Sequence, residues 1–193
     1  MINRRLRSEK EVVDYLSKSS ISDEDSEKII STLKSIGLVN DYNFARAYTN
    51  DKMHLTLCGP YKIAIDLQSH NIDSVIINEM IDNYPEELIS EHIEKIIMKK
   101  IKTNKRYVGN VLKRRIVSYL SKLGYSRESI SKHLYLITID TDLMQQEMEK
   151  TYKSYAAKYS GDDLYFKVKA KLISRGFESS DINNFLDNVK KAT

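Results

Sequence analysis

Several residue types that shape common folds and sites are scarce in this 193-residue chain. Tryptophan is absent, cysteine occurs once, and the chain contains only 6 glycines and 2 prolines. A single cysteine, Cys58, excludes an intramolecular disulfide and suits a reducing compartment. Because residues that break helices are so few, long helices with short connections are favoured over a β fold with many turns.

Long apolar runs are missing as well. No stretch of about 18 apolar residues exists, so no membrane-spanning helix and no membrane partner are expected. The N-terminal sequence MINRRLRSEKEV has no apolar stretch after its arginines and is not expected to be a signal peptide. Hydrophobic residues make up 41% of the chain, charged residues make up 30%, and the mean hydropathy is −0.48. These values indicate a thin core in a cytoplasmic protein.

Motifs for catalysis, metal binding and cofactor binding are absent too. The four histidines are too widely spaced for an HExxH or similar site. His133 occupies a position that is apolar in related parts of the chain, so we interpret it as a structural histidine. Nothing nominates a base beside Cys58, which is predicted to be an inert thiol near a helix end. We therefore predict no catalytic residue, no metal, no cofactor and no enzymatic activity.

A pattern of apolar residues recurs four times along the chain. Its anchor is a leucine, and successive anchors are 51, 53 and 52 residues apart. Positions four before, five after, fourteen after and seventeen after each anchor are also apolar. The anchors are Leu16, Leu67, Leu120 and Leu172. Such nearly constant spacing is typical of a protein built from structural repeats.

Within each repeat, the spacing predicts two helices joined by a tight turn. Ile116, Leu120 and Leu123 fall at positions i, i+4 and i+7, which places them on one face of a helix. The residue between the two helices is a glycine or a polar substitute, which suits a left-handed helix end. These turn residues are Ser20, Asn71, Gly124 and Gly176, and the predicted caps that follow are Ser22, Asp73, Ser126 and Ser179.

A further helix is expected before each of the later pairs, at 41–53, 85–101 and 142–159. The predicted units are a two-helix unit at 1–40 and three-helix units at 41–84, 85–138 and 139–193. Each unit would bury its apolar stripe against the next. The predicted fold is therefore all-α, an elongated and curved array of tandem three-helix repeats.

One segment carries a conflicting signal. The residues FKVKAKL at 166–172 alternate between apolar and polar, as a strand does. The corresponding segments at 61–67 and 114–120 show no alternation, and Val168 and Leu172 are still four residues apart. The repeat therefore favours a helix.

Positive charge is concentrated in one part of the chain. The formal net charge is +4, yet residues 99–135 carry 11 basic and 1 acidic residues, whereas residues 61–98 carry 2 and 8. The segment 99–115 contains no acidic residue and holds Lys99, Lys100, Lys102, Lys105, Arg106, Lys113, Arg114 and Arg115. Smaller basic groups occur at Arg4, Arg5 and Arg7, and at Lys167, Lys169, Lys171 and Arg175.

The basic segment has two interpretations. Lysines near a helix C-terminus are favourable in themselves, so a solvated charge run is the simpler one. The absence of any compensating acid over 17 residues instead favours a surface for phosphate backbones or for an acidic protein. If the units stack regularly, Lys167 and Lys169 could lie on the same face as Arg114 and Arg115. No recognition helix is identifiable, so contact with DNA is expected to be weak and nonspecific.

Four segments, in this order, resemble the RecX family of bacterial regulatory proteins. They are LRSEKEVVDYL (6–16), LVNDYNFARAY (38–48), GPYKIAIDLQSHNI (59–72) and LSKLGYSRESI (120–130). The resemblance spans nearly the whole chain, and the order and spacing of the segments carry it. Ser20 and Asn71 depart from the family pattern, in which glycine is common at this turn. The chain also begins almost at the first repeat, so contacts made by the longer N-terminal extension of some relatives are expected to be missing.

The resemblance implies a function that the residues alone do not. RecX proteins bind filaments of the RecA recombinase on DNA, lodge in the filament groove and suppress strand exchange, ATP hydrolysis and co-protease activity. The expected partners are the RecA filament and single- or double-stranded DNA, and the protein is expected to be monomeric. The ten basic residues expected to contact the filament or nucleic acid are the eight of segment 99–115 with Lys167 and Lys169. Two alternatives are an autonomous nonspecific DNA-binding protein and a helical scaffold for another partner.

Overall fold

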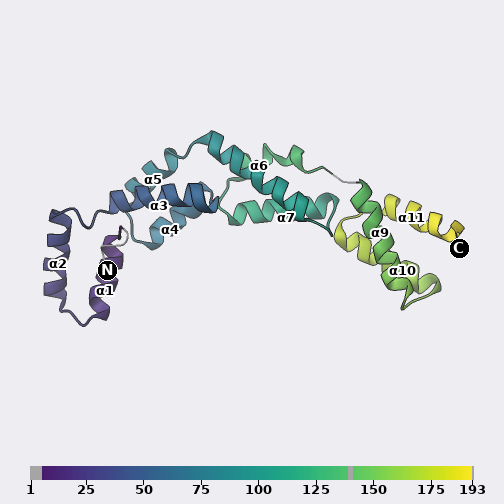
Figure 1. Cartoon of the computed structure of the whole chain (residues 1–193), viewed down its shortest axis with the longest axis horizontal. Helices are drawn as coiled ribbons and strands as arrows, with labels where there is room; N and C mark the ends of the chain where they lie inside the picture. Colours follow the sequence, from purple (N-terminus) through teal and green to yellow (C-terminus); the bar gives the residue numbers. More distant parts are fainter. Residues whose placement is uncertain (1–5, 139–140, 193) are drawn as a thin grey trace. The chain divides into compact units, whose positions relative to one another are not determined.

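The computed structural model describes residues 6–138 and 141–192, and these residues contain helices and no strand. The all-α repeat fold predicted from the sequence is therefore confirmed. The helices, drawn in Figure 1, are α1 Glu9–Lys18, α2 Asp23–Ser35, α3 Asp41–Thr56, α4 Pro60–Ser69, α5 Ser74–Asp82, α6 Glu86–Thr103, α7 Gly109–Lys122, α8 Arg127–Ser131, η2 Leu134–Leu136, α9 Thr141–Ala156, α10 Gly161–Arg175 and α11 Ser179–Ala192.

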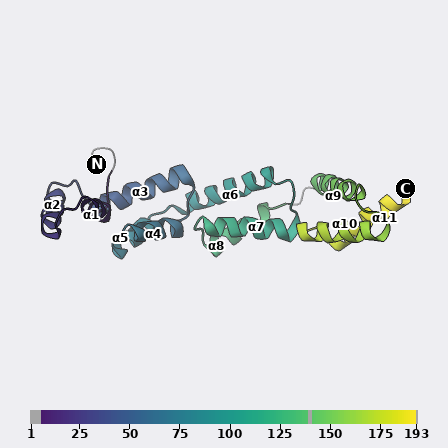
Figure 2. The ribbon, with the colours of Figure 1, turned by 90° about the horizontal axis from the view of Figure 1, so that it is seen from below.

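The chain folds into two compact bodies. Among the described residues, the first body contains 6–92 and 121–129, and the second contains 93–120, 130–138 and 141–192. In the first body α1 packs on α2, and α5 packs on both α3 and α4; in the second body α10 packs on α9 and α11 (Figure 2). The predicted division of the chain into four repeat units stays a prediction. The first and last of these units begin at residues 1 and 139, which lie outside the described residues.

The repeat anchors lie at the centre of the core. Leu67, Leu120 and Leu172 are completely buried, and Leu16 is 6% exposed. In the second body Leu172 belongs to an apolar cluster with residues of α9 and α11, including Phe185. Burying side chains of this size stabilises the fold by about 1.5–3 kcal/mol each. The leucine pattern in the sequence therefore marks the positions that hold the helices together.

Helix caps and turns follow the sequence closely. The Ser22 hydroxyl accepts a hydrogen bond from the Asp25 amide, and Asp73 and Ser126 cap their helices in the same way. The prediction that Ser179 is a cap is wrong: α11 begins at Ser179, and the Glu178 carbonyl accepts the first helical hydrogen bond, from the Ile182 amide. The cap therefore lies one residue earlier than the serine pattern indicated.

The predicted left-handed turns are confirmed at all four positions. The φ angles are +56° at Ser20, +58° at Asn71, +88° at Gly124 and +99° at Gly176. Asparagine tolerates this conformation better than most residues, whereas serine has no such advantage. The turns at Ser20 and Asn71 therefore keep the same backbone geometry without glycine.

Gly124 and Gly176 have a second role, which is to allow close backbone contact. The Gly59 amide at the start of α4 donates to the Leu123 carbonyl over 2.7 Å, and the Tyr61 amide donates to the Gly124 carbonyl over 3.1 Å. A Cβ atom at Gly124 would overlap the backbone nitrogen of Lys62. In the second body the Val108 amide donates to the Arg175 carbonyl over 3.0 Å, and a Cβ at Gly176 would overlap the Val108 carbonyl. Each helix start thus docks on the turn of a later repeat.

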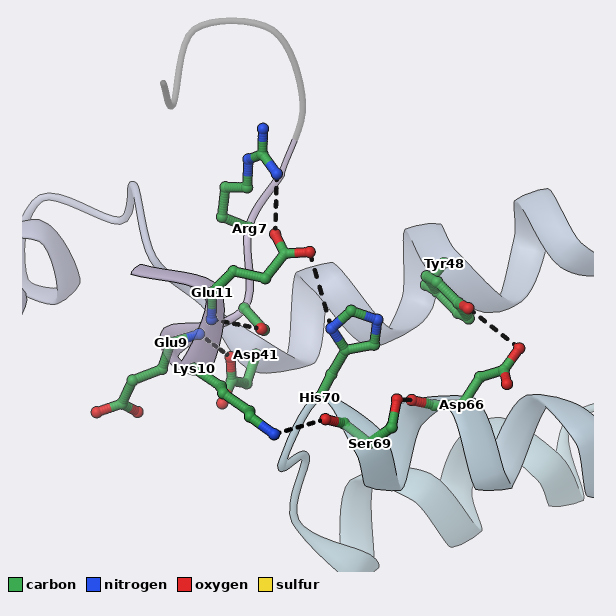
Figure 3. Close-up of polar contacts among 10 residues, drawn as sticks. Arg7, Glu9, Lys10, Glu11, Asp41, Tyr48, Asp66, Ser69 and His70 are labelled. Carbon is green, nitrogen blue, oxygen red and sulfur yellow. Dashed lines mark hydrogen bonds and ion pairs between the residues drawn. The ribbon is translucent and has the colours of Figure 1, made fainter. Parts of the chain in front are cut away.

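The turn at Asn71 uses side chains for the same docking (Figure 3). The Lys10 ammonium group at the start of α1 donates to the Ser69 carbonyl over 3.0 Å, and the Glu11 carboxylate lies 3.8 Å from Nδ1 of His70. Arg7 binds the other Glu11 oxygen at 3.2 Å. Because side chains bridge this junction, the turn needs no glycine for close approach.

Two segments test how far the repeat predicts local structure. Residues 166–172 lie within α10, with Val168 and Leu172 buried, so the helical prediction is confirmed against the strand-like alternation. The helix expected after Ser126 is broken instead, into α8 and the single turn η2. The break falls at Lys132 and His133, between Ser131 and Leu134. Tyr135, Ile137 and Thr138, which follow it, have weak helix propensity and do not favour a longer second piece.

Candidate nucleic-acid interface

The basic segment forms the end of α6, a short connection and the start of α7. Asn104 organises the connection: its side-chain amide donates to the Tyr107 carbonyl over 2.7 Å, and its side-chain oxygen accepts from the Tyr107 amide over 3.0 Å. This local hydrogen bonding is typical of an asparagine that ends a helix and starts a turn. We call residues 99–115 the basic hairpin, all of which lies within the second body.

The positive charges of the basic hairpin are accessible and uncompensated. Seven of its eight basic side chains belong to exposed residues, and the eighth, Lys100, is half-buried. Across the described residues, none of the eight lies within 4.0 Å of a carboxylate oxygen. A surface with unpaired lysine and arginine groups attracts phosphate and other anions.

Two tyrosines hold basic groups of the hairpin in place. The Lys100 ammonium group lies 3.5 Å from the ring centre of Tyr119, and the Arg115 guanidinium lies 4.2 Å from that of Tyr107. Cation–π contacts at exposed sites contribute about 0.5–1 kcal/mol each. Both contacts orient a cation without neutralising it, so the charge is still available to an anion.

Lys167 and Lys169, the other two predicted site residues, differ from the hairpin residues. Lys167 lies 3.7 Å from the Asp163 carboxylate and 4.8 Å from the Tyr159 ring centre, and Lys169 donates to the Asn183 side chain over 2.9 Å. Both are half-buried on α10. These local partners make the two lysines weaker candidates than the hairpin residues.

Of the smaller basic groups, Arg7 and Arg175 are engaged, Arg4 and Arg5 are not described, and Lys171 is exposed on α10. Arg175 binds the Glu147 carboxylate at 3.2 Å and the Thr151 hydroxyl at 2.9 Å, largely shielded from solvent. Arg7 is paired with Glu11 at the first docking junction. Arg4 and Arg5 lie outside the described residues. The basic hairpin therefore stands out because eight basic groups without a carboxylate partner in the described residues lie within one 17-residue segment.

A pocket of about 450 Å³ opens beside the basic hairpin. Lys102, Lys105 and Lys113 line it from the hairpin, and Leu134 and Ile137 line it from the segment around η2. Sequence reasoning missed this pocket because its two walls are about thirty residues apart in the chain. It also missed Asn104 and Tyr119, of which only the asparagine leaves a sequence signal, as a turn former after a helix.

The remaining candidate groups for chemistry are buried in the core. Cys58 is 9% exposed, and its carbonyl accepts a 3.0 Å hydrogen bond from the Tyr84 hydroxyl, which also contacts Nδ1 of His92 at 3.2 Å. His133 is 7% exposed, with Nε2 at 3.9 Å from the Glu94 carboxylate. No cluster of three or more potential ligands that could bind a metal ion occurs within 6–138 and 141–192. In the same described ranges, every helix is too short or too polar to cross a membrane.

Comparisons with known proteins point to one family. The family model described as "RecX, third three-helix domain" matches residues 139–186. The regulatory protein RecX of Oceanobacillus iheyensis is 31% identical over 192 residues, covering 96% of this chain and 71% of that protein. The RecX of Bacillus pumilus is 30% identical over 191 residues, with coverage of 96% and 73%.

The fold leads to the same family. The crystal structure of RecX from Lactobacillus salivarius superimposes with a TM-score of 0.64 at 25% identity, covering 70% of this chain and 88% of that one. A second RecX crystal structure matches in fold with a TM-score of 0.63 at 20% identity, over 68% of this chain and 66% of its own. Sequence and fold agree, and the chain belongs to the RecX family of regulatory proteins.

Proposed function

We propose that this protein is a non-enzymatic regulator that binds RecA filaments on DNA and inhibits the recombinase, ATPase and co-protease activities of RecA. Membership of the RecX family supports the regulatory role. The single observation that carries the contact with nucleic acid is the basic hairpin, whose eight basic groups lack carboxylate partners in the described part of the chain. Proteins of this charge pattern bind nucleic acid through phosphates, largely irrespective of sequence.

In this proposal the basic hairpin contacts the nucleic acid within the filament, while other surfaces contact RecA itself. Lys105, Lys113 and Arg114 are among the exposed residues of the hairpin and are proposed to contact phosphates. Binding to naked DNA would be weak, because the hairpin supplies only a local patch of charge on a chain of net charge +4. The regulator is proposed to act as a monomer in the cytoplasm.

The first test compares filament with naked DNA. Labelled protein is titrated at near-physiological salt with single-stranded DNA and, separately, with RecA assembled on the same DNA with a non-hydrolysed nucleotide. Fluorescence anisotropy is expected to show at least tenfold tighter binding to the filament, and added protein is expected to lower the ATPase rate of RecA. Equal affinity for both targets would contradict the proposal.

Matched charge variants test the role of the basic hairpin. Changing Lys105, Lys113 and Arg114 to glutamine removes three positive charges from the hairpin. Changing the exposed residues Lys18, Lys158 and Lys191 to glutamine removes three charges elsewhere. The hairpin variant is expected to bind filaments at least fivefold more weakly than the control variant. Equal affinities would place the nucleic-acid contact away from the hairpin.

A second candidate function is autonomous nonspecific DNA binding, which the same basic hairpin favours. It predicts that naked DNA is bound as tightly as the filament and that RecA adds nothing to the affinity. The anisotropy comparison distinguishes the two functions directly.

A further inference from the structure

The pocket beside the basic hairpin combines basic and apolar side chains. Its rim carries Lys102, Lys105 and Lys113, all exposed and none paired with a carboxylate in the described residues. Leu134 and Ile137, whose side chains are half-buried, line it from the segment around η2. A ligand that fits both kinds of side chain has an apolar part and a flanking negative charge.

The size of the pocket narrows the class of ligand. A volume of about 450 Å³ lies within the usual range of about 300–1,000 Å³ for small-molecule and cofactor sites. A lysine rim alone would bind phosphate without selecting a pocket, and an apolar wall alone would not attract an anion. A nucleobase with its adjacent phosphates satisfies both requirements.

Whether the bound nucleic acid is single-stranded or double-stranded follows from the need to reach the base. In a duplex, the faces of each base are covered by its neighbours, and reaching a pocket requires costly unstacking. In a single strand, the bases are free to leave the stack, and proteins bind them by combining a basic track with aromatic side chains on which the bases stack. Tyr107 is the aromatic residue that lines this pocket. The pocket therefore suits single-stranded rather than double-stranded DNA.

We propose that the pocket formed by the basic hairpin and residues 134–138 binds one unstacked base of single-stranded DNA, while Lys102, Lys105 and Lys113 bind the flanking phosphates. This inference rests on the proposed function, in which the hairpin contacts nucleic acid. It adds a contact with the base, which a purely electrostatic interface lacks. Binding would then depend on the presence of bases as well as on charge.

The test separates base from phosphate with matched DNA probes. Labelled oligo(dT) of twenty nucleotides, an oligonucleotide of the same length and charge with abasic sites throughout, and a twenty-base-pair duplex are titrated by anisotropy at low salt. The wild-type protein is expected to bind oligo(dT) about tenfold more tightly than the abasic strand, since contact with a base face contributes about 1–3 kcal/mol. Equal affinity for the two strands would overturn the proposal.

A pocket-filling variant completes the test. Thr138 lines the pocket and is exposed, so Thr138→Trp fills the pocket without disturbing the core. It is expected to lower the affinity for oligo(dT) to that for the abasic strand, while the affinity for the abasic strand is unchanged. Ser154→Trp, at an exposed position on α9 outside the pocket, is the control and is expected to behave as the wild type.

The outcomes distinguish this inference from the proposed function. Unchanged oligo(dT) binding by Thr138→Trp would refute the base pocket and leave filament regulation standing. If Thr138→Trp also lost binding to the abasic strand, the tryptophan would be disturbing the hairpin. In that case the affinities of the wild-type protein for oligo(dT) and for the abasic strand decide whether a base is bound. No binding of any strand or filament by the wild type would refute the proposed function itself.

Discussion

At the scale of single residues, Asp66 shows how charge is balanced within the first body. Its carboxylate lies 2.6 Å from the Lys62 ammonium group, 3.2 Å from the Tyr48 hydroxyl and 3.8 Å from the Lys52 ammonium group. Burial is the largest single influence and would raise the pKa of Asp66, but the hydrogen bond and charge of Lys62, with Tyr48 and Lys52, together lower it. The ionised form is therefore favoured in the folded protein.

This lowered pKa predicts a pH dependence of stability. Because the folded-state pKa lies below 3.8, the stabilisation is present above that pH and is lost as the pH falls through the folded-state value. Asp66→Asn is expected to lower the free energy of unfolding by about 0.5–1 kcal/mol at pH 7, since the group is partly exposed. Urea titrations of both proteins at pH 7 and pH 3 measure the difference. A difference that persists unchanged at pH 3 would contradict the role of the charge.

Tyr84 is a more deeply buried polar group of the first body. Burial chiefly raises the pKa of Tyr84 to about 12. Its hydroxyl group, which contacts the Cys58 carbonyl and His92, thus stays protonated as a donor at neutral pH. Tyr84→Phe leaves that carbonyl unpaired and is expected to lower the free energy of unfolding by about 1–3 kcal/mol.

A matched control is available on the surface. Tyr135 is 70% exposed, so Tyr135→Phe is expected to change the free energy of unfolding by less than about 0.5 kcal/mol. Chemical denaturation at pH 7 compares the two variants. Similar effects at both positions would mean that the buried hydrogen bond of Tyr84 contributes nothing measurable.

At the scale of elements, the docking of a helix start on a later turn is the recurring joint of this fold. Gly37 and Gly124 both have positive φ, +74° and +88°, but no atom lies within 4 Å of a Cβ placed at Gly37. Gly37→Ala therefore carries only the conformational penalty of about 1–2 kcal/mol. Gly124→Ala adds overlap with the backbone of Lys62 and is expected to cost at least about 2 kcal/mol more.

Thermal and urea unfolding of the two alanine variants separates the two penalties. Asn71→Gly provides the opposite control, because side chains rather than backbone atoms bridge that joint. It is expected to change stability by less than about 1 kcal/mol. Equal destabilisation by Gly37→Ala and Gly124→Ala would show that backbone docking contributes little to the fold.

The features that the sequence predicts are those that depend on residues close together in the chain. The four leucine anchors and left-handed turns follow from period and propensity, and they are found at the expected residues. The docking role of Gly124 could not be predicted, because it depends on Lys62, which is distant in sequence. The break between α8 and η2 escaped prediction as well, because the repeat pattern continues through it.

The basic residues of the hairpin could be identified from the sequence, but whether each of them has a local partner could not. Charge counts treated Lys167 and Lys169 like Lys105, whereas the structure gives the first two local partners. The pocket depends on residues near η2 approaching the hairpin, which is a tertiary contact. Sequence therefore predicts which charges exist, and packing decides which of them are unpaired.

At the scale of the whole molecule, the distribution of charge matters more than its sum. Each lysine or arginine that neutralises a phosphate releases counterions, so the logarithm of the affinity for single strands falls with the logarithm of salt concentration at about −0.7 per contact. If the basic hairpin makes three to six such contacts, the slope for oligo(dT) is expected to lie between about −2 and −4. A chain that bound through its overall charge would instead respond equally to the loss of any cation.

The two triple-glutamine variants decide between these cases because each removes the same number of charges. Loss of Lys105, Lys113 and Arg114 is expected to make the slope shallower by about 2, since three phosphate contacts disappear. Loss of Lys18, Lys158 and Lys191 is expected to change the slope by less than about 0.5, because charges away from the contact are screened beyond about 10 Å at 0.1 M salt. Anisotropy titrations of oligo(dT) between 50 and 200 mM salt measure both slopes. Equal slopes for the two variants would mean that the affinity for DNA depends on the net charge of the protein. The basic hairpin would then not be the interface.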